Sequence, residues 1–209
     1  MTNPWLEIPL TDYESHMALP AIAQAQMLAD GLVTALQRFT PDTVAIVGCA
    51  GGNGFDRIPA STRRVVGVDI NPDYIAAAST RYGAHISGLE LHVADIQAGP
   101  LPFEPVELLY AALVFEYVSL PTALRHLAQA CQPGGHLISV LQLPAEQLHA
   151  VSPSPYRSLQ TLPPLMRLVP PDELAASATL HGFTQEAEYT TMLDSGKAFA
   201  TQVFRRTSG

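Results

Sequence analysis

A glycine-rich loop that follows a short apolar run constrains the fold of this chain more than any other feature. Residues 44–54 read Val-Ala-Ile-Val-Gly-Cys-Ala-Gly-Gly-Asn-Gly, and a second apolar run at 65–68 ends on Asp69. Short runs of Val and Ile are typical of buried parallel strands, and glycines let a ligand approach the backbone closely. An acid at the tip of the next strand can accept both hydroxyls of a ribose. We therefore expect an adenosine-containing ligand.

The composition favours one compact domain. The 209 residues are 47% hydrophobic and 14% charged, with a formal net charge of −8. Domains commonly span ~100–200 residues, and so few charges are typical of a packed core. Because Lys and Arg must neutralise phosphates, the acidic balance argues against a nucleic-acid partner. We expect a single domain over 1–209, made of N-terminal helices (1–40), a ligand-binding core (44–143), a connecting loop (144–170), and a helix plus hairpin (171–209).

Targeting, membrane and metal signals are weak in this sequence. No segment approaches the ~18 unbroken apolar residues of a membrane span, and the first residues lack the pattern of a signal peptide. Cys49 and Cys131 form no disulfide framework or Cys-x-x-Cys site, and the seven histidines have no close ligand spacing. We expect no metal, no membrane partner and a cytoplasmic setting, while the oligomeric state stays open.

Strand and helix patterns alternate through the first two thirds of the chain. We predict helices at 12–17 and 20–39, then strands at 44–48, 65–69, 89–93, 106–111 and 137–143, with a helical turn at 55–58, helices at 72–78 and 120–130, and a turn at 132–135. Such alternation favours a parallel sheet with right-handed crossovers.

The last forty residues have a different pattern. A predicted helix at 171–180 precedes strands at 184–193 and 198–205, and the glycine-containing loop between these strands is a hairpin signal. The predicted fold class is α/β, a Rossmann-like doubly wound and mostly parallel sheet with a C-terminal antiparallel hairpin strand.

A long proline-rich connection spans residues 144–170 and contains Ser152, Ser154, Tyr156 and Arg157. Long connections inside a compact domain are often functional lids. This one leaves the carboxyl end of a strand, which is the edge where open α/β sheets bind ligands. We predict that it is a lid or substrate loop.

Two phosphate-binding interpretations of the glycine loop compete with a phosphate-free one. A P-loop requires Gly-Lys-Ser/Thr, whereas Gly54 is followed by Phe55, and Lys197 is the sole lysine. A dinucleotide fingerprint requires Gly-x-Gly-x-x-Gly, but Arg57 stands where the last glycine belongs. Pro59 also cuts short the helix whose dipole would face a pyrophosphate. An adenosyl ligand without phosphates fits better.

The chain at this point resembles the class I S-adenosylmethionine-dependent methyltransferases. Residues 48–54 look like the first motif of that family, 66–72 like the second, and 93–96 like the third. Residues 108–117 and the Gln-Pro-Gly-Gly-His-Leu segment at 132–137 match its fourth strand and the turn before the fifth. The C-terminal hairpin is similar to the reversed last strand of the family, which dinucleotide-binding folds lack.

The resemblance implies S-adenosylmethionine as cofactor and assigns roles to several residues. Asp69 would accept the ribose hydroxyls, Ile70 would pack on the adenine, and Asp95 would accept from the adenine amino group. The N–H groups of Gly48 and Gly52 would receive the donor carboxylate, since no Cβ blocks its approach. The full predicted cofactor-binding set is Gly48, Cys49, Ala50, Gly52, Asn53, Asp69, Ile70, Asp95, Ile96 and Ala112.

Structural roles compete with some of these assignments. Asp69 could cap the helix that begins near Pro72, Asp95 could form an Asx turn, and Cys49 is expected to be a small packing residue. Two positions depart from the family pattern, because Ile46 replaces an acid that usually helps hold the methionine end and Ala50 replaces the second glycine. Glu116 could supply a substitute charge.

Catalysis by such an enzyme depends first on aligning the acceptor with the methyl group, and a base is needed only if the acceptor must lose a proton. The catalytic candidates are His16, Glu116 and Tyr117, with structural alternatives of a surface helix residue for His16 and a solvated helix start for Glu116. Tyr13, Glu14 and Gln142 are expected to shape the pocket.

The predicted function is S-adenosylmethionine-dependent methyl transfer to a small-molecule acceptor by in-line displacement. A protein acceptor stays open at this point. The alternative is an S-adenosylmethionine-binding sensor or scaffold without transfer activity, and the missing acid at Ile46 is the feature that favours it.

Overall fold

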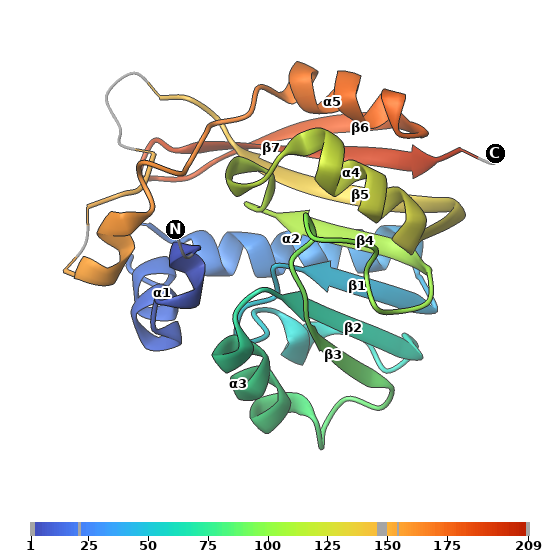
Figure 1. The fold of residues 1–209 in the computed structure, drawn as a ribbon, viewed down its shortest axis with the longest axis horizontal. Coiled ribbons are helices and arrows are strands. Elements are labelled where there is room, and N and C mark those ends of the chain that lie inside the picture. The colour runs from blue at the N-terminus through green and yellow to red at the C-terminus, as the bar shows by residue number, and fades with distance from the viewer. Residues whose placement is uncertain (1–2, 21, 146–149, 154, 208–209) are drawn as a thin grey trace.

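A seven-stranded sheet organises the computed structural model, which describes residues 3–20, 22–145, 150–153 and 155–207. The strand order is β3-β2-β1-β4-β5-β7-β6 (Figure 1). Strands β1 to β5 pair in parallel, whereas β7 pairs antiparallel with both β5 and β6. The predicted fold class is confirmed. The strands are β1 Thr43–Val47, β2 Arg64–Asp69, β3 Leu89–Val93, β4 Val106–Ala112, β5 Cys131–Gln142, β6 Phe183–Met192 and β7 Ala198–Arg206.

Helices cover both faces of the sheet, and the side chains of β1 show how. Val44 and Ile46 join the apolar cluster beneath α2, while Ala45 and Val47 join the cluster beneath α4 and α5. Alternate residues of a strand point to opposite faces, so a fully apolar run suits a strand covered twice. In Figure 1, α4 lies in front of the sheet and α2 behind it. The helices are α1 Leu10–Met17, α2 Gln24–Phe39, α3 Pro72–Tyr82, α4 Leu120–Ala130 and α5 Pro171–Leu180, with short 3-10 helices η1 Pro4–Leu6, η2 Phe55–Arg57, η3 Phe115–Tyr117 and η4 Arg157–Thr161.

Several predicted boundaries differ from the structure, and two of the differences have a clear cause in the backbone. The helix expected from residue 20 begins at Gln24, because Ala23 has a φ of 50° and a left-handed residue cannot continue a right-handed helix. The turn expected at 132–135 lies inside β5, where the pairing partner of β4 shifts from Cys131 to His136. This excursion is a bulge in the strand, with Gly134 at a positive φ of 80°.

The turn from β2 into α3 follows its sequence signals. The side chain of Asn71 accepts a hydrogen bond from the N–H of Asp73 at 2.9 Å, and Pro72 occupies the first helical position. The helix continues to Tyr82, beyond the predicted end at residue 78. This cap fixes the chain directly after Asp69, at the carboxyl end of β2.

The N-terminal segment and part of the 144–170 connection cover the carboxyl edge of the sheet (Figure 1). Ile8, Leu159 and Leu162 form a buried apolar cluster at this place. The hydroxyl of Ser158 donates to Oδ2 of Asp12 at 2.6 Å, which joins η4 to α1. Open α/β sheets bind ligands at this edge, so any ligand there lies beneath a cover made by two distant parts of the chain.

Candidate ligand-binding site

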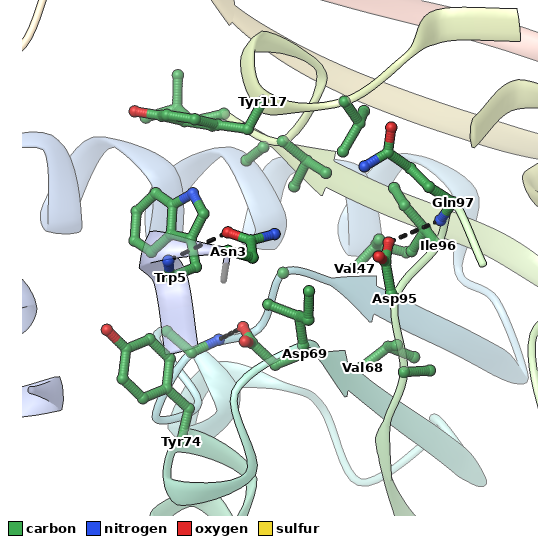
Figure 2. A pocket seen from close by; sticks show the side chains of 18 of the residues that line it. Asn3, Trp5, Val47, Val68, Asp69, Tyr74, Asp95, Ile96, Gln97 and Tyr117 are labelled. Carbon is green, nitrogen blue, oxygen red and sulfur yellow. Dashed lines mark hydrogen bonds between the residues drawn. The ribbon is translucent and has the colours of Figure 1, made fainter. Parts of the chain in front are cut away.

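A pocket opens at the carboxyl ends of β1, β2, β3 and β4, and Figure 2 shows most of its lining. Its empty space, counted with the open mouth, is about 720 Å³, within the size range of small-molecule sites. We call it the edge pocket. It is lined by Asn3, Trp5, Tyr13, Val47, Gly48, Ala50, Val68, Asp69, Ile70, Tyr74, Ala94, Asp95, Ile96, Gln97, Ala112, Leu113, Val114, Tyr117 and Val118.

The edge pocket contains two carboxyl groups and no cationic side chain among the described residues. Asp69 and Asp95 are the only charged residues of the lining, and no Lys, Arg or His of the described chain contributes to it. Phosphate groups are bound by basic side chains or by free backbone N–H groups. A pocket whose only charged groups are carboxyl groups instead favours a ligand with hydroxyl, amino or cationic groups. The composition of the lining therefore supports the phosphate-free interpretation of the glycine loop.

Asp69 lies at the end of β2 and is 8% exposed. Its Oδ1 accepts the N–H of Asn71 and its Oδ2 accepts the N–H of Ala50, both at 2.9 Å. Burial raises the pKa of Asp69, and these N–H groups act in the opposite direction. Because two carboxylate oxygens have about four acceptor positions, two backbone bonds leave acceptor capacity toward the pocket. Asp69 thus supports the turn before α3, as the structural alternative expected, and also faces the pocket.

Asp95 follows β3 and faces the same space. Its Oδ1 accepts the N–H of Gln97 at 2.8 Å, which is the expected Asx turn. In Figure 2, Asp95, Ile96 and Gln97 lie on one side of the space, and Trp5 and Tyr74 lie on the other. The turn holds one oxygen of Asp95 and leaves the other available.

The loop after β1 has a tight backbone path. Gly48 has a φ of 69°, and a Cβ there would lie 2.7 Å from Cγ2 of Val114, so only glycine fits. Ala50, at the position of a family glycine, also has a positive φ of 47°. Its N–H bond to Asp69 helps hold this conformation, which an L-residue adopts at a cost of roughly 1–2 kcal/mol.

The N–H groups of this loop already have partners within the protein. Gly48 and Cys49 donate to the carbonyl of Val68 at 2.8 and 3.0 Å, and Gly52 donates to the carbonyl of Cys49 at 2.9 Å. In this conformation Gly48 and Gly52 have partners within the protein, so the binding of a ligand carboxylate by them and their neighbours stays a prediction. Each N–H has one proton to donate, and these protons are used to shape the turn.

Three of the predicted cofactor residues lie outside the lining of the edge pocket. The thiol of Cys49 is buried in the apolar cluster beneath α2, where burial raises its pKa, as suits a packing residue. The side-chain amide of Asn53 donates to the carbonyl of Ala25 at 2.9 Å, toward α2. A Cβ at Gly52 would lie 2.6 Å from the ring of Tyr82. The structure brings the other seven predicted residues to the pocket, namely Gly48, Ala50, Asp69, Ile70, Asp95, Ile96 and Ala112.

Comparison with known proteins agrees with this geometry. Residues 46–139, which run from β1 into β5, match the family described as "Methyltransferase domain". Over this segment the chain is similar to methyltransferase domains, and its fold is that of S-adenosylmethionine-dependent methyltransferases. The structural resemblance extends beyond the matched residues and covers most of the chain, whereas no curated protein matches the sequence.

Several solved methyltransferases share the fold. The N-methyltransferase NodS from Bradyrhizobium japonicum WM9, in complex with S-adenosyl-L-homocysteine, has a TM-score of 0.67 at 17% identity, covering 88% of each chain. An S-adenosylmethionine-dependent methyltransferase from Mesorhizobium loti has 0.63 at 18%, covering 85% of this chain and 100% of the other. Magnesium protoporphyrin IX methyltransferase from Synechocystis PCC 6803, with bound S-adenosylmethionine, has 0.64 at 14%, covering 89% and 81%. These identities are low, so the likeness shows a shared fold.

A second cavity adjoins the edge pocket. We call it the side pocket, and both pockets are lined by Trp5, Tyr13, Leu113 and Tyr117. These four residues form a shared wall. Leu113 has a positive φ of 56°, which is unusual for a large side chain and typical of functional positions. The side pocket is further lined by His16, Met17, Gln24, Gln142, Ala150, Val151, Ser152, Leu159, Leu162, Met166 and Lys197.

Of the three catalytic candidates, the structure brings Tyr117 and His16 to the cavities. Tyr117 lines both pockets, and burial raises the pKa of its hydroxyl. His16 lines the side pocket and is 6% exposed, so it is not the surface residue of the structural alternative. Its Nδ1 has no hydrogen-bond partner among the described residues. Burial and the positive charge of Lys197 lower its pKa, which keeps the imidazole neutral near pH 7.

Glu116 is placed differently from its prediction. It lines neither pocket and is 1% exposed, so it is neither a solvated helix start nor a charge at the ligand. Its Oε1 accepts the N–H of Gln142 at 2.8 Å, while its Oε2 has no partner in the described part of the chain. Burial raises the pKa of Glu116 to about 7. The side chain joins η3 to the end of β5.

The residues expected to shape the pocket have separate positions. Tyr13 lines both pockets and Gln142 lines the side pocket. Glu14 lines neither, because it forms an ion pair with Arg81 of α3, with its Oε2 2.9 Å from Nη2. Arg81 also donates to the carbonyl of Gly51 at 3.2 Å. This ion pair joins α1 to α3 across the glycine loop.

Sequence reasoning missed the N-terminal wall of the edge pocket. The carbonyl of Trp5 accepts the side-chain amide of Asn71 at 2.8 Å, and the hydroxyl of Tyr74 donates to the carbonyl of Ile8 at 3.0 Å. The Trp5 ring is edge-on to Tyr13 and Tyr117, with centroids 5.7 and 5.1 Å away. Trp5 is the sole tryptophan, and that rarity was the one signal that could have pointed to it.

The remaining negative expectations concern membranes and metals. Within the described residues, no helix combines the length and the hydropathy required to cross a bilayer. The same part of the chain contains no cluster of three or more His, Cys, Asp or Glu side chains that could hold a metal ion.

Proposed function

We propose that this chain transfers the methyl group of S-adenosylmethionine to a small-molecule acceptor by in-line displacement. The observation that carries the proposal is the wall shared by the edge pocket and the side pocket. A donor in the first cavity and an acceptor in the second would meet at Leu113 and Tyr117. Methyl transfer requires this arrangement, because the acceptor must approach along the line of the breaking bond.

The edge pocket would seat the adenosyl part of the donor. Asp69 would accept the ribose hydroxyls, and Asp95 would accept from the adenine amino group. Ile70 and Ile96 would pack against the adenine, with Gly48, Ala50 and Ala112 on the sides of β1 and β4. Since Cys49, Gly52 and Asn53 lie outside the lining, we assign them to the support of the loop.

The aromatic rings of the shared wall suit the reacting end. S-adenosylmethionine supplies an electrophilic methyl group on a sulfonium. Trp5, Tyr13 and Tyr117 would face that positive charge, and aromatic faces attract cations by about 0.5–2 kcal/mol. Such an attraction also compensates in part for the absence of an acid at Ile46, which is buried beneath α2 and points away from the pocket.

Proton removal would fall to His16. Its imidazole is kept neutral by burial and by Lys197, and its Nδ1 is free to accept among the described residues. Tyr117 would stay protonated, because burial raises its pKa. Glu116 is a positioning residue that holds the end of β5 through Gln142. A base is needed only for acceptors that lose a proton.

A small molecule suits the side pocket because the 144–170 connection closes over it. Ala150, Val151, Ser152, Leu159 and Met166 of this connection contribute to the lining. Ser154 and residues 146–149 lie outside the described residues, so the proposed lid rests on the remaining part. We also propose one domain for residues 1–209 and a cytoplasmic setting, which the free thiols of Cys49 and Cys131 support.

Calorimetry followed by a turnover screen tests the proposal. S-adenosylmethionine and S-adenosylhomocysteine should each bind at one site, and NAD should not. A panel of small metabolites is then incubated with the enzyme and the donor, and release of S-adenosylhomocysteine is measured. Release with at least one acceptor is expected. Donor binding without turnover across a broad panel would favour the sensor or scaffold, and binding of NAD in place of the donor would overturn the assignment.

A further inference from the structure

We propose that the side pocket binds an acceptor that carries a carboxylate, and that Lys197 is the residue that recognises this group. The proposal rests on the proposed methyl transfer and adds the chemical class of the acceptor. It assigns a role to the sole lysine of the chain, which lies directly before β7 and far in sequence from the other lining residues.

Lys197 is held in place with donor capacity to spare. Its side chain is buried, with the residue 4% exposed, and it lines the side pocket. The ammonium group donates to the carbonyl of Ala150 at 2.8 Å and to Oε1 of Gln142 at 3.3 Å. An ammonium group has three donors, and the described residues occupy two of them, which leaves the third for a ligand. Two neutral acceptors orient the group without neutralising it.

No carboxylate of the described residues forms an ion pair with Lys197. An uncompensated buried cation is costly, and burial lowers the pKa of Lys197 to about 8. The group is still mostly charged at pH 7. A ligand carboxylate would supply the counter-ion that the described residues do not provide, and it would form a charge-assisted hydrogen bond.

The titratable groups around Lys197 limit the charge of the ligand. His16 of α1 is neutral near pH 7, and burial keeps the hydroxyls of Tyr13 and Tyr117 protonated. Glu116 of η3 contacts the same Gln142 through the backbone N–H and does not reach the cavity. A single positive charge in the lining suits one monoanion. A phosphate dianion would leave one of its negative charges without a cationic partner in this lining.

The rest of the side pocket suits an apolar body. Met17, Leu159, Leu162 and Met166 line it together with Leu113 of the shared wall. Apolar side chains bind apolar surface, whereas the few polar groups of a pocket fix the orientation of the ligand. The acceptor would place its carboxylate at Lys197 and its nucleophilic atom toward Tyr117, where the edge pocket begins.

The single lysine makes a direct test possible. Protein labelled with ¹³C at lysine Cε gives one lysine side-chain NMR signal, which is titrated with pH in the presence of saturating S-adenosylhomocysteine. The probes are a series of alkyl and aryl monocarboxylates, from acetate to octanoate and phenylacetate, and their matched primary amides. At least one carboxylate should raise the pKa of Lys197 by one unit or more, whereas its amide should not. Equal responses to acids and amides, or no response to any acid, would overturn the proposal.

Two variants separate charge recognition from a structural role. Lys197→Met should weaken binding of the responding carboxylate at least tenfold by calorimetry, whereas Lys197→Arg should keep it within about threefold. Binding of the matched amide should be the same in all three proteins. Equal loss of acid and amide in Lys197→Met would overturn the proposal, because it would reveal a packing role. S-adenosylhomocysteine should bind each protein equally, since Lys197 does not line the edge pocket, and failure of that binding in the wild type would instead refute the proposed function.

Discussion

Oδ2 of Asp69 accepts a hydrogen bond from the backbone N–H of Ala50 at 2.9 Å, which ties the tip of β2 to the loop after β1. Ala50 has a positive φ, so this bond stabilises a backbone conformation that its side chain disfavours. The same carboxylate lines the edge pocket. Asp69 therefore both supports the loop of the proposed donor site and lines that site. A change at this position should affect both the stability of the fold and the binding of the donor.

Asp69→Ala should weaken binding of S-adenosylhomocysteine by about 1–3 kcal/mol, the usual range for lost hydrogen bonds to a charged acceptor. The variant should also unfold more easily, by about 1–3 kcal/mol, because the buried N–H groups of Ala50 and Asn71 lose their partner. Calorimetry and urea unfolding measure the two effects. Asp73→Ala, an exposed change on α3, is the matched control. Unchanged affinity in Asp69→Ala would count against a ribose contact.

Glu116→Gln should change how stability depends on pH. The folded pKa of Glu116 is about 7 against an ordinary value of 4.5, so the fold favours the protonated form. The stabilisation of the fold by protonated Glu116 is therefore fully present below pH 4.5. It is lost as the pH rises through 7, where the folded protein releases this proton. One pKa unit corresponds to about 1.4 kcal/mol, so the loss amounts to roughly 3 kcal/mol. The glutamine variant should lack this loss and should be more stable than wild type at pH 8 by urea unfolding.

The exposed residue Glu7 offers the control for that experiment. Glu7→Gln should leave the difference in stability between pH 5 and pH 8 as it is in the wild type. Donor binding by Glu116→Gln should stay within about threefold, since Glu116 does not line the edge pocket. A glutamine variant with the wild-type pH dependence would contradict the burial of an ionisable group there.

Gly48→Ala should destabilise the fold by about 2–4 kcal/mol. A Cβ at this position would lie 2.7 Å from Val114, and the φ of 69° is unfavourable for any L-residue. Gly99→Ala is the matched control, because a Cβ at Gly99 has no atom within 4 Å. Urea unfolding of the two variants tests the contrast. Equal stabilities would mean that the loop after β1 has a different conformation.

Trp5 should report donor binding by fluorescence, since it is the sole tryptophan and lines the edge pocket. Saturation with S-adenosylhomocysteine should change its emission, and Trp5→Ala should weaken binding by about 1–2 kcal/mol through lost aromatic contact. Trp5→Phe keeps an aromatic ring and should bind within about fivefold of the wild type. Unaltered emission at a concentration that calorimetry shows to be saturating would place Trp5 away from the ligand.

The parallel core could be predicted because its signals are local. A Val and Ile run, a glycine turn and an acid at the next strand tip lie within 26 residues, from Val44 to Asp69, and each fixes the chain near itself. The cap at Asn71 and the hairpin of β6 and β7 are equally local. For this reason the parallel sheet, the hairpin and the positions of Asp69 and Asp95 after the ends of their strands follow from sequence.

The 144–170 connection could be predicted as a lid, but the way it packs on the N-terminal segment could not, because that packing depends on contacts between distant residues. Trp5 is held by Asn71, and Ser158 by Asp12. The sequence indicated Tyr13 and His16 as pocket residues, but no pattern around Trp5 itself or around Lys197 indicates that these two line a pocket. Glu116 shows the opposite error, since its place after an apolar strand suggested a ligand contact, but its carboxylate turns to the N–H of Gln142. The carbonyls of Val68 and Cys49 accept the N–H groups of the loop after β1. This bonding likewise could not be predicted, because it depends on how the turn folds.

A crystal structure of the protein with S-adenosylhomocysteine tests the central claim most directly. The ribose hydroxyls should lie within hydrogen-bond distance of Asp69, the adenine amino group should lie near Asp95, and the sulfur should point to the wall of Trp5, Leu113 and Tyr117. An adenosyl group bound elsewhere, or an edge pocket filled by the protein's own side chains at saturating ligand, would contradict the account.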